Sequence, residues 1–186
     1  MNKLHEFMEM ICGTFENIAQ YTREARDGSI IHPKAKRIIG LCNDKIMNLE
    51  NSFQGFFVLE ESCYETEEKT TVFHHLFLFD VNEQGKIRLT SYEAPSTIDK
   101  EKLTNSNKDL QLDFKQLKIS EKFTPLLYEE ANGEFFGKSI SFFSPVTKFT
   151  LSMRITPHKM FVNEVFENNG KRMLGYDEPI AYEKLS

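Results

Sequence analysis

The spacing of apolar residues along the chain changes near residue 50. Between residues 4 and 25 apolar side chains recur at intervals of three and four positions, as in an amphipathic helix. Gly13 interrupts this run, so we expect one helix before it and a second short helix beginning near Ile18. The segment 36–46 fits either a helix or a strand, and we assign it as a strand.

From Phe53 onwards apolar and polar residues alternate, which is typical of β-strands. This pattern predicts a meander of three strands at 53–65, 70–81 and 86–93. A polar stretch at 97–117 follows, with short helical turns predicted at 99–103 and 113–117. Six further predicted strands cover 124–130, 134–143, 148–155, 159–168, 171–176 and 180–184.

Turn-forming residues separate these strands. Two of the turns contain Asn-Gly, which favours a tight hairpin because both residues tolerate positive φ. Short strands without long helices between them predict a mainly β fold, an antiparallel barrel or sandwich. We expect a single domain over residues 1–186, with a helical N-terminus at 1–26 and the β-structure at 36–186.

The first meander brings histidines and glutamates together. Four-residue loops at 66–69 and 82–85 would pair Glu60 with His75, and His75 with Tyr92. On the other face they would pair Glu61 with His74, and His74 with Glu93. One face would carry Phe57, Leu59, Leu76, Leu78 and Leu89, and the other Phe56, Val58, Phe73, Phe77, Phe79 and Arg88. Both faces are apolar, so we expect this sheet to be covered on both sides.

A histidine between carboxylates has three interpretations. It forms satisfied polar pairs in a half-buried sheet, it contacts a ligand, or it takes part in catalysis or metal binding. No second histidine falls on the same face nearby, and the sequence holds no nucleophile motif. Catalytic residues therefore stay unassigned, and no metal site is predicted.

Glu164 is a carboxylate on an otherwise apolar face. A two-residue loop at Asn169-Gly170 would place Glu164 opposite Gly175 and Phe166 opposite Met173, and the preceding hairpin would place Glu164 opposite Leu151. Burying an unpaired carboxylate is costly. We expect Glu164 either at the edge of a cavity, near an open barrel end, or paired with an arginine from elsewhere.

Composition narrows the possible partners. The net charge is −5, and the short basic run at 34–37 is interpreted as solvated surface, so nucleic-acid binding is not expected. The 17 phenylalanines fall mostly in alternating segments and are assigned to the core, although such an interior also suits a planar apolar ligand. The N-terminal segment lacks a long apolar core, so neither a signal peptide nor a membrane span is expected, and a cytoplasmic location is predicted.

The sequence predicts no functional site at the cysteines or at the remaining histidines. Three widely spaced cysteines favour small buried apolar side chains over disulfides or zinc binding. The histidines in terminal or turn positions, which we expect to be exposed, are His5, His32 and His158.

The order of these elements resembles the CpcT/CpeT-like phycobiliprotein chromophore lyases. Residues 13–20 (GTFENIAQ) are similar to that family's Gly-x-Phe-x-Asn-x-x-Gln, and 55–64 (GFFVLEESCY) to its Tyr-Val-Glu-Gln-like strand. Further similar segments are 96–103 (STIDKEKL), 112–117 (LDFKQL) and 174–182 (LGYDEPIAY). The chain departs from the family at Thr70 to His75, which replace Pro-Tyr-Arg-Gln-Arg, and at Leu174, which replaces a tryptophan.

The resemblance implies a calycin (lipocalin-like) β-barrel that binds a chromophore, with Glu60 on the side of the pocket. The aromatic face of the meander would then line the cavity, and the aliphatic face would pack under the helices. The predicted ligand-binding residues are Glu60, His75, Tyr92, Phe56, Phe73, Phe77 and Glu164.

Three functions follow as hypotheses. The first is a barrel that binds a small apolar or amphipathic molecule, a tetrapyrrole or a lipid, without a resident cofactor. The second is a lyase or isomerase that uses Glu60 with His75, or Glu61 with His74 and Glu93. The third is an interaction protein with a filled barrel, whose partner is a protein client or a second copy of the chain.

Overall fold

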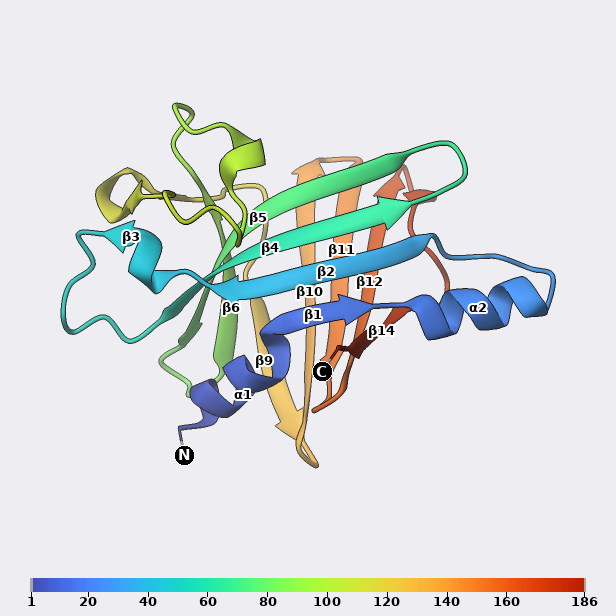
Figure 1. Ribbon diagram of the computed structural model, residues 1–186, viewed down its shortest axis with the longest axis horizontal. Helices are drawn as coiled ribbons and strands as arrows, with labels where there is room; N and C mark the ends of the chain where they lie inside the picture. Colours follow the sequence, from blue (N-terminus) through green and yellow to red (C-terminus); the bar gives the residue numbers. More distant parts are fainter. Residues whose placement is uncertain (1, 186) are drawn as a thin grey trace.

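The computed structural model describes residues 2–185, which form a closed antiparallel β-barrel of ten strands (Figure 1). The strands follow one another around the barrel in the order β11-β10-β9-β6-β5-β4-β2-β1-β14-β12, and β12 pairs with β11 to close the ring. The barrel strands are β1 (Gly13–Glu16), β2 (Lys34–Leu41), β4 (Phe56–Glu65), β5 (Thr70–Val81), β6 (Ile87–Glu93), β9 (Leu126–Ala131), β10 (Glu134–Ser144), β11 (Thr147–Ile155), β12 (Lys159–Asn168) and β14 (Ile180–Lys184).

Smaller elements decorate the barrel. Strand β13 (Lys171–Leu174) pairs with β12, and β8 (Lys118–Ile119) pairs with β6. A separate parallel pair consists of β3 (Ile46–Met47) and β7 (Leu112–Asp113). The helices are α1 (Lys3–Ile11) and α2 (Ile18–Arg26), with single 3₁₀ turns η1 (Asn43–Lys45), η2 (Lys100–Lys102) and η3 (Phe114–Gln116). No helix within residues 2–185 is long and apolar enough to cross a membrane.

The predicted mainly β fold is confirmed, as are the two helices separated at Gly13. The strand assigned to 36–46 is confirmed in part, because β2 ends at Leu41 and a 3₁₀ turn follows it. Among the ten barrel strands only β1, between the helices, was not expected, and the short strands β3, β7 and β8 outside the barrel were not expected either. Strand β1 joins β2 to β14, which come from opposite ends of the barrel sequence. Its strand conformation depends on this long-range pairing rather than on local sequence.

Helix α1 closes one end of the barrel. Asn2 accepts a hydrogen bond from the backbone of Leu4 and so begins the helix. The apolar face of α1 points into the barrel, where the Phe7 ring lies 4.7 Å from that of Tyr128 and 4.9 Å from that of Phe135. Figure 1 shows α1 beside β9, whereas α2 extends away from the barrel.

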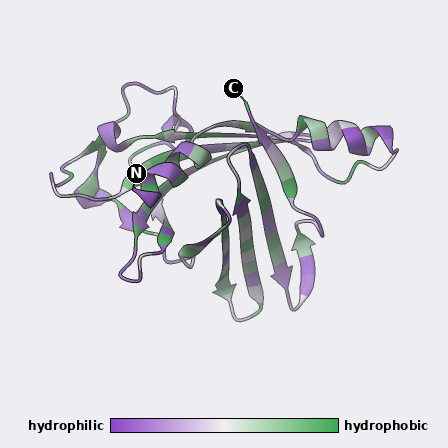
Figure 2. Cartoon of the chain, turned by 90° about the horizontal axis from the view of Figure 1, so that it is seen from below, coloured by the Kyte–Doolittle hydropathy of each residue, from purple (hydrophilic) through white to green (hydrophobic). Residues whose placement is uncertain are grey.

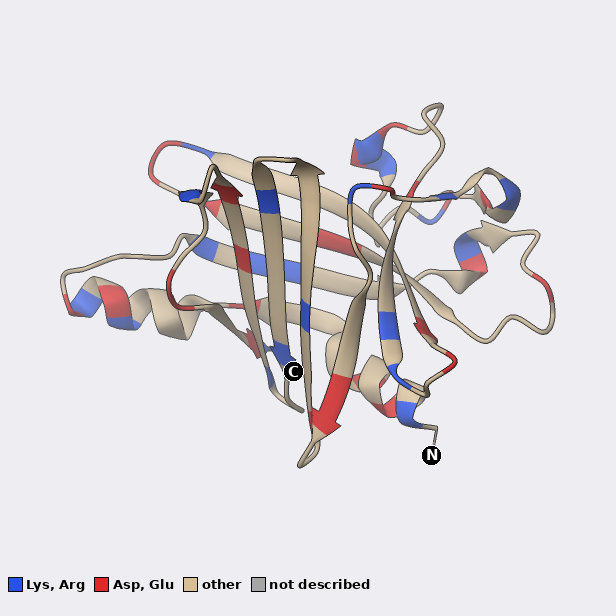
Figure 3. Cartoon of the chain, turned by 180° about the vertical axis from the view of Figure 1, so that it is seen from behind, with Lys and Arg blue, Asp and Glu red and all other residues tan. Residues whose placement is uncertain are grey.

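Apolar residues alternate with polar ones along the barrel strands (Figure 2). Along the chain Lys and Arg are interspersed with Asp and Glu (Figure 3), and some form exposed ion pairs such as Lys159–Glu183. The inward apolar residues, together with the face of α1, form the main core.

A second apolar core covers the outer face of β4 and β5, so the prediction that this sheet is covered on both sides is confirmed. The cover comes from the segment after β6 and from the connection between β2 and β4, and not from the N-terminal helices. Asn105 fastens it, because its amide donates to the backbone oxygen of Leu59 and to Glu61. The buried residues of this core are Cys42, Ile46, Phe57, Leu59, Leu76, Leu78, Leu103, Leu110, Leu112 and Leu117.

The predicted pairing of β4 with β5 is confirmed, since Glu60 lies opposite His75 and Glu61 opposite His74. The predicted pairing of β5 with β6 is wrong by one residue, and Leu76 rather than His75 lies opposite Tyr92. The loop holds five residues, 82–86, because the Asn82 side chain accepts hydrogen bonds from two backbone N–H groups within it.

This one-residue shift exchanges the two faces of β6. Arg88 lies outside the barrel, where it pairs with Asp80, and not on the inner face as predicted. Leu89, which was assigned to the outer face, instead belongs to the main core inside the barrel.

The predictions around Glu164 are confirmed in part. Glu164 lies opposite Leu151, and Glu167 opposite Arg172. The predicted Phe166–Met173 pair is wrong, because a bulge places Leu174 opposite Phe166. Met173 is exposed, as are the other residues of β13.

The packing of α1 in one end of the barrel gives a prediction for stability. We expect Phe7→Ala to lower the free energy of unfolding by about 3–5 kcal/mol, because it leaves a cavity among the rings of Phe79, Tyr128 and Phe135. Glu6→Ala, on the exposed side of the same helix, should change it by less than about 0.5 kcal/mol. Urea denaturation followed by circular dichroism measures both, and equal effects would show that α1 does not close the barrel.

Candidate functional site

The interior of the barrel contains a buried arginine. Strand β2 alternates so that Ala35, Arg37 and Ile39 face inward, while Lys36 faces solvent. Arg37 is only 3% exposed. The interpretation of 34–37 as solvated surface is therefore wrong for Arg37.

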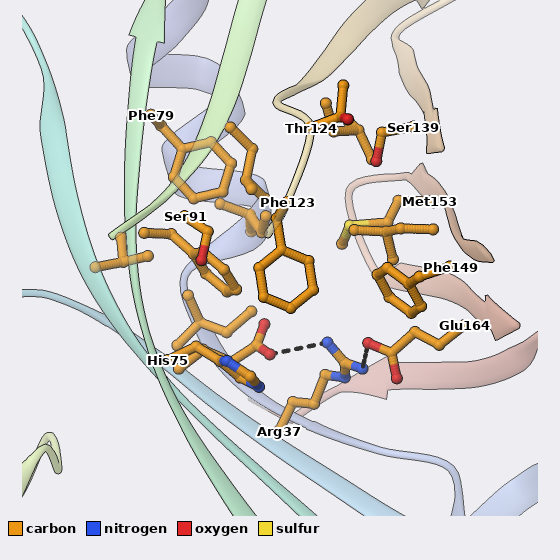
Figure 4. A pocket seen from close by; sticks show the side chains of 18 residues that line it. Arg37, His75, Phe79, Ser91, Phe123, Thr124, Ser139, Phe149, Met153 and Glu164 are labelled. Carbon is orange, nitrogen blue, oxygen red and sulfur yellow. Dashed lines mark hydrogen bonds and ion pairs between the residues drawn. The ribbon is translucent and has the colours of Figure 1, made fainter. Parts of the chain in front are cut away.

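Four side chains from three other strands hold the Arg37 guanidinium. Its Nη1 donates to Glu60 Oε1 at 3.0 Å, and its Nη2 to Glu164 Oε1 at 3.0 Å (Figure 4). Nη2 also donates to the Tyr64 hydroxyl at 2.8 Å, and Nε to the Tyr182 hydroxyl at 3.3 Å. These five residues, Arg37, Glu60, Tyr64, Glu164 and Tyr182, are called the arginine cluster below.

The charges in this cluster depend on one another. Burial opposes the charge of Arg37, but the attraction of Glu60, together with that of Glu164, outweighs it and raises the guanidinium pKa well above its usual value. Burial likewise opposes the charge of Glu164, yet Arg37 lowers its pKa below the usual range. The hydroxyl of Tyr64 donates to Glu164 Oε2 at 3.2 Å, and burial raises the pKa of this phenol, which stays neutral.

A cavity of about 70 Å³ lies between the arginine cluster and α1 (Figure 4). This is room for several water molecules or for a small chemical group. Ile11 contributes to the cavity from α1. Apolar side chains make most of its wall, namely Ile11, Ile39, Val58, Phe77, Phe79, Leu89, Phe123, Leu126, Phe149, Leu151 and Met153, and the polar members are Arg37, Glu60, His75, Ser91, Thr124, Ser139 and Glu164.

A second compartment of about 260 Å³ is lined by residues of the β4–β5 loop and of the β13–β14 connection. We call it the mouth. Arg37 and Glu164 line both the mouth and the inner cavity. The side chain of Glu164 is 36% exposed against 6% for Glu60, and its exposed surface borders these two compartments.

His75 faces the inner cavity from β5. Its ring stacks against those of Phe73 and Phe77, with centroids 6.3 and 5.3 Å away. Within residues 2–185 no side chain or backbone group forms a hydrogen bond with either ring nitrogen. Burial is the main cause that lowers its pKa, so the imidazole is neutral at pH 7 and can either donate to or accept from a bound molecule.

The predicted ligand-binding residues are only partly brought together. Four of them, Glu60, His75, Phe77 and Glu164, line the inner cavity, and Phe73 lines the mouth. Phe56 points towards α1 and contacts His5, outside the cavity lining. Tyr92 lies on the outer face against Phe57, at 5.2 Å, because of the shifted β6 register.

Sequence reasoning missed three members of the arginine cluster, Arg37, Tyr64 and Tyr182. The alternation of Ala35, Arg37 and Ile39 was a usable sign, since it places Arg37 between two apolar residues on one strand face. The expectation that Glu164 pairs with an arginine from elsewhere, one of three alternatives, is confirmed by its contact with Arg37.

Glu61 and His74 serve the cover over β4 and β5. Glu61 accepts hydrogen bonds from Asn105, and His74 Nδ1 lies 3.1 Å from the backbone oxygen of Leu103. The predicted pairing of His74 with Glu93 is wrong, because the shifted register of β6 moves Glu93 to the other strand face, where it accepts from Ser120. Within residues 2–185 no group of three or more His, Cys, Asp or Glu side chains is placed to hold a metal ion.

A second buried polar group lies beside α2. His32, which was expected to be exposed, is buried, and its Nδ1 lies 2.6 Å from Glu24 Oε1. The other ring nitrogen contacts the backbone oxygen of Glu178 at 3.0 Å. These bonds tie the end of α2 to the segment before β14. His5 and His158 are exposed, as predicted.

The three cysteines are free, and burial argues against reactivity of Cys42. Cys42 is fully buried, and burial raises the pKa of its thiol to about 12. The thiolate, which is the reactive form, is therefore scarce at pH 7.

No family model matches this chain, and neither does any curated protein.

The cluster predicts a large effect for Arg37→Met. Removing the guanidinium leaves Glu60 and Glu164 without their counter-charge, so we expect a loss of about 3–5 kcal/mol in the free energy of unfolding. The triple variant Arg37→Met/Glu60→Gln/Glu164→Gln should recover much of this loss, because no buried charge remains. Lys36→Met, which removes only an exposed pair with Glu16, should cost less than about 1 kcal/mol. If the triple variant is less stable than Arg37→Met, charge compensation is not the role of Arg37.

The lowered pKa of His75 predicts a pH dependence. The unfolded chain, with a histidine pKa near 6.5, binds a proton more readily than the folded protein, so stability should fall as the pH drops below about 6.5. We expect the slope between pH 7 and pH 5.5 to be smaller in His75→Gln than in the wild type. His158→Gln, at an exposed histidine, serves as the control in denaturant titrations at several pH values. A slope that His75→Gln leaves unchanged would contradict the burial of a neutral His75.

Proposed function

We propose that this chain is a ligand-binding protein with a calycin-like barrel, which holds a small and mainly apolar molecule in its interior. The observation that carries this proposal is the inner cavity, whose wall is apolar except for a few polar groups. Small-molecule sites commonly combine an apolar lining with a few polar groups that orient the ligand. The interior of a small barrel is also a common place for such a site.

The two ends of the barrel support an entry opposite α1. Phe7 and its neighbours on α1 fill one end, whereas the mouth lies on the far side of the arginine cluster.

Phe123 offers a second route, because it lines both the inner cavity and a groove outside β5 and β6. Its ring contacts those of Phe143 and Phe149 at 5.3 and 5.7 Å. A rotation of Phe123 would join the cavity to this groove.

The size of the space favours a ligand smaller than the tetrapyrrole implied by the family resemblance. The inner cavity measures about 70 Å³ and the mouth about 260 Å³. Sites for drug-sized ligands usually enclose about 300–1,000 Å³. One aromatic ring or a short aliphatic chain fits this space better than four linked pyrroles.

Two small neutral molecules, 2-phenylethanol and indole, test the proposal. We expect at least one to bind with a dissociation constant on the order of 1 mM or tighter, as its number of atoms allows. Saturation-transfer NMR detects the contact, and calorimetry gives the affinity. Ser139→Phe should abolish binding, because Ser139 lines the cavity and the larger ring fills it.

Ile140→Phe is the matched control, since Ile140 lies next to Ser139 on β10 and is exposed. Circular dichroism shows whether each variant folds, and Ser91→Leu offers a second way to fill the cavity. If neither these two molecules nor 2-phenylethylamine, an amine of the same shape, binds the wild type, the proposal is wrong. If the cavity-filling variants bind as well as Ile140→Phe, the ligand sits elsewhere.

A further inference from the structure

The hydrogen-bonding capacity of Arg37 is nearly used up by the protein itself. A guanidinium has five N–H donors, and four hydrogen bonds connect Arg37 to Glu60, Glu164, Tyr64 and Tyr182. One N–H on Nη1 is left. An incoming carboxylate would therefore find a single free donor, between two carboxylates already in place.

The charges around the cavity are unbalanced. Among the described residues Arg37 is the only Lys or Arg that lines it, against the two carboxylates of Glu60 and Glu164. His75, the remaining ionisable group, is neutral at pH 7 because burial lowers its pKa. Lys69 lies at the mouth, but its exposed position allows water and salt to screen its charge. The interior therefore favours a positive charge over a negative one.

One oxygen of Glu60 is available to a ligand. Oε1 accepts from Arg37 and from Ser62, whereas Oε2 has no hydrogen-bond partner within residues 2–185. Among the same residues every side-chain N or O atom that is sealed off does have a partner. Oε2 must therefore border space that a water molecule can enter, although Glu60 as a residue is only 5% exposed.

We propose that the barrel selects a small organic cation, an amine with one apolar group, whose N–H donates to Glu60 Oε2. This inference rests on the proposed ligand-binding function and specifies the chemistry of its ligand. The apolar part lies against the wall that Phe77, Leu89 and Leu151 contribute. The ammonium lies at Glu60 Oε2, because Arg37 already fills the space between Glu60 and Glu164. His75 Nδ1 or Nε2 can accept a second hydrogen bond from the same ammonium.

Three probes of similar size and shape separate charge from burial, namely 2-phenylethylamine, 2-phenylethanol and phenylacetate. At pH 7.5 the first is a cation, the second neutral and the third an anion. Calorimetry should show that the amine binds about tenfold tighter than the alcohol or more, since charge-assisted hydrogen bonds are about twice as strong as neutral ones. Phenylacetate should bind most weakly.

Glu60→Gln tests the contact, because it removes the charge and keeps the shape. The preference for the amine over the alcohol should fall to near parity in this variant, and it should decrease in Glu164→Gln. Glu129→Gln, the same change at an exposed glutamate on β9, should keep the full preference. Thermal unfolding of each variant verifies that it is folded, and if Glu60→Gln fails to fold, the wild-type probe series decides the proposal alone.

Each outcome distinguishes the two proposals. If the alcohol binds and the amine binds no tighter, the cation preference is wrong and the binding function stands. If phenylacetate binds tightest, the free N–H of Arg37 anchors an anion, and the inference is overturned. If none of the three binds, the binding function itself fails.

Discussion

The ion pairs between Arg37 and two glutamates, Glu60 and Glu164, connect distant parts of the barrel. Arg37 comes from β2 and Glu60 from the adjacent β4. Glu164 comes from β12 and lies 127 residues after Arg37 in the chain. Removing three charged groups from water is expensive, and their mutual attraction offsets this cost only when the hydrogen bonds are nearly complete. The phenols of Tyr64 and Tyr182 supply the missing partners. The cluster is therefore best understood as one unit that fixes both the interior polarity and the relative position of these strands.

The apolar residues around this unit explain why the cavity is small and well defined. Phenylalanine, leucine and methionine side chains fill the barrel between the cluster and α1, and the second core fixes the outer side of β4 and β5. With both faces covered, these strands cannot change their register without exposing one core. The carboxylate of Glu60 is thereby held at the cavity wall, with one oxygen bound to Arg37 and the other directed to open space.

Much of the architecture could be predicted from sequence. Alternation located nearly all of the barrel strands, and turn residues located the hairpins, because both depend on interactions between residues close in the chain. The β4–β5 pairing followed from a four-residue loop. The β5–β6 pairing did not, because the Asn82 side chain holds a five-residue loop in place of the expected four. The one extra residue in this loop places Tyr92 on the outside of the barrel and Leu89 on the inside. The bulge opposite Phe166 likewise has no counterpart in the simple alternation.

The candidate site divides in the same way. By itself the sequence determined that Glu60 and His75 lie opposite each other, and that Glu164 occupies an apolar face, since strand alternation and loop length specify these facts. Only the tertiary structure decided that Arg37 lies inside the barrel and meets both glutamates. That contact depends on closure of the ring through β1 and β14, which joins segments from the two ends of the chain. Charge pairing over such sequence distances leaves no periodic pattern, because it is set by how the strands close and not by the spacing of neighbours.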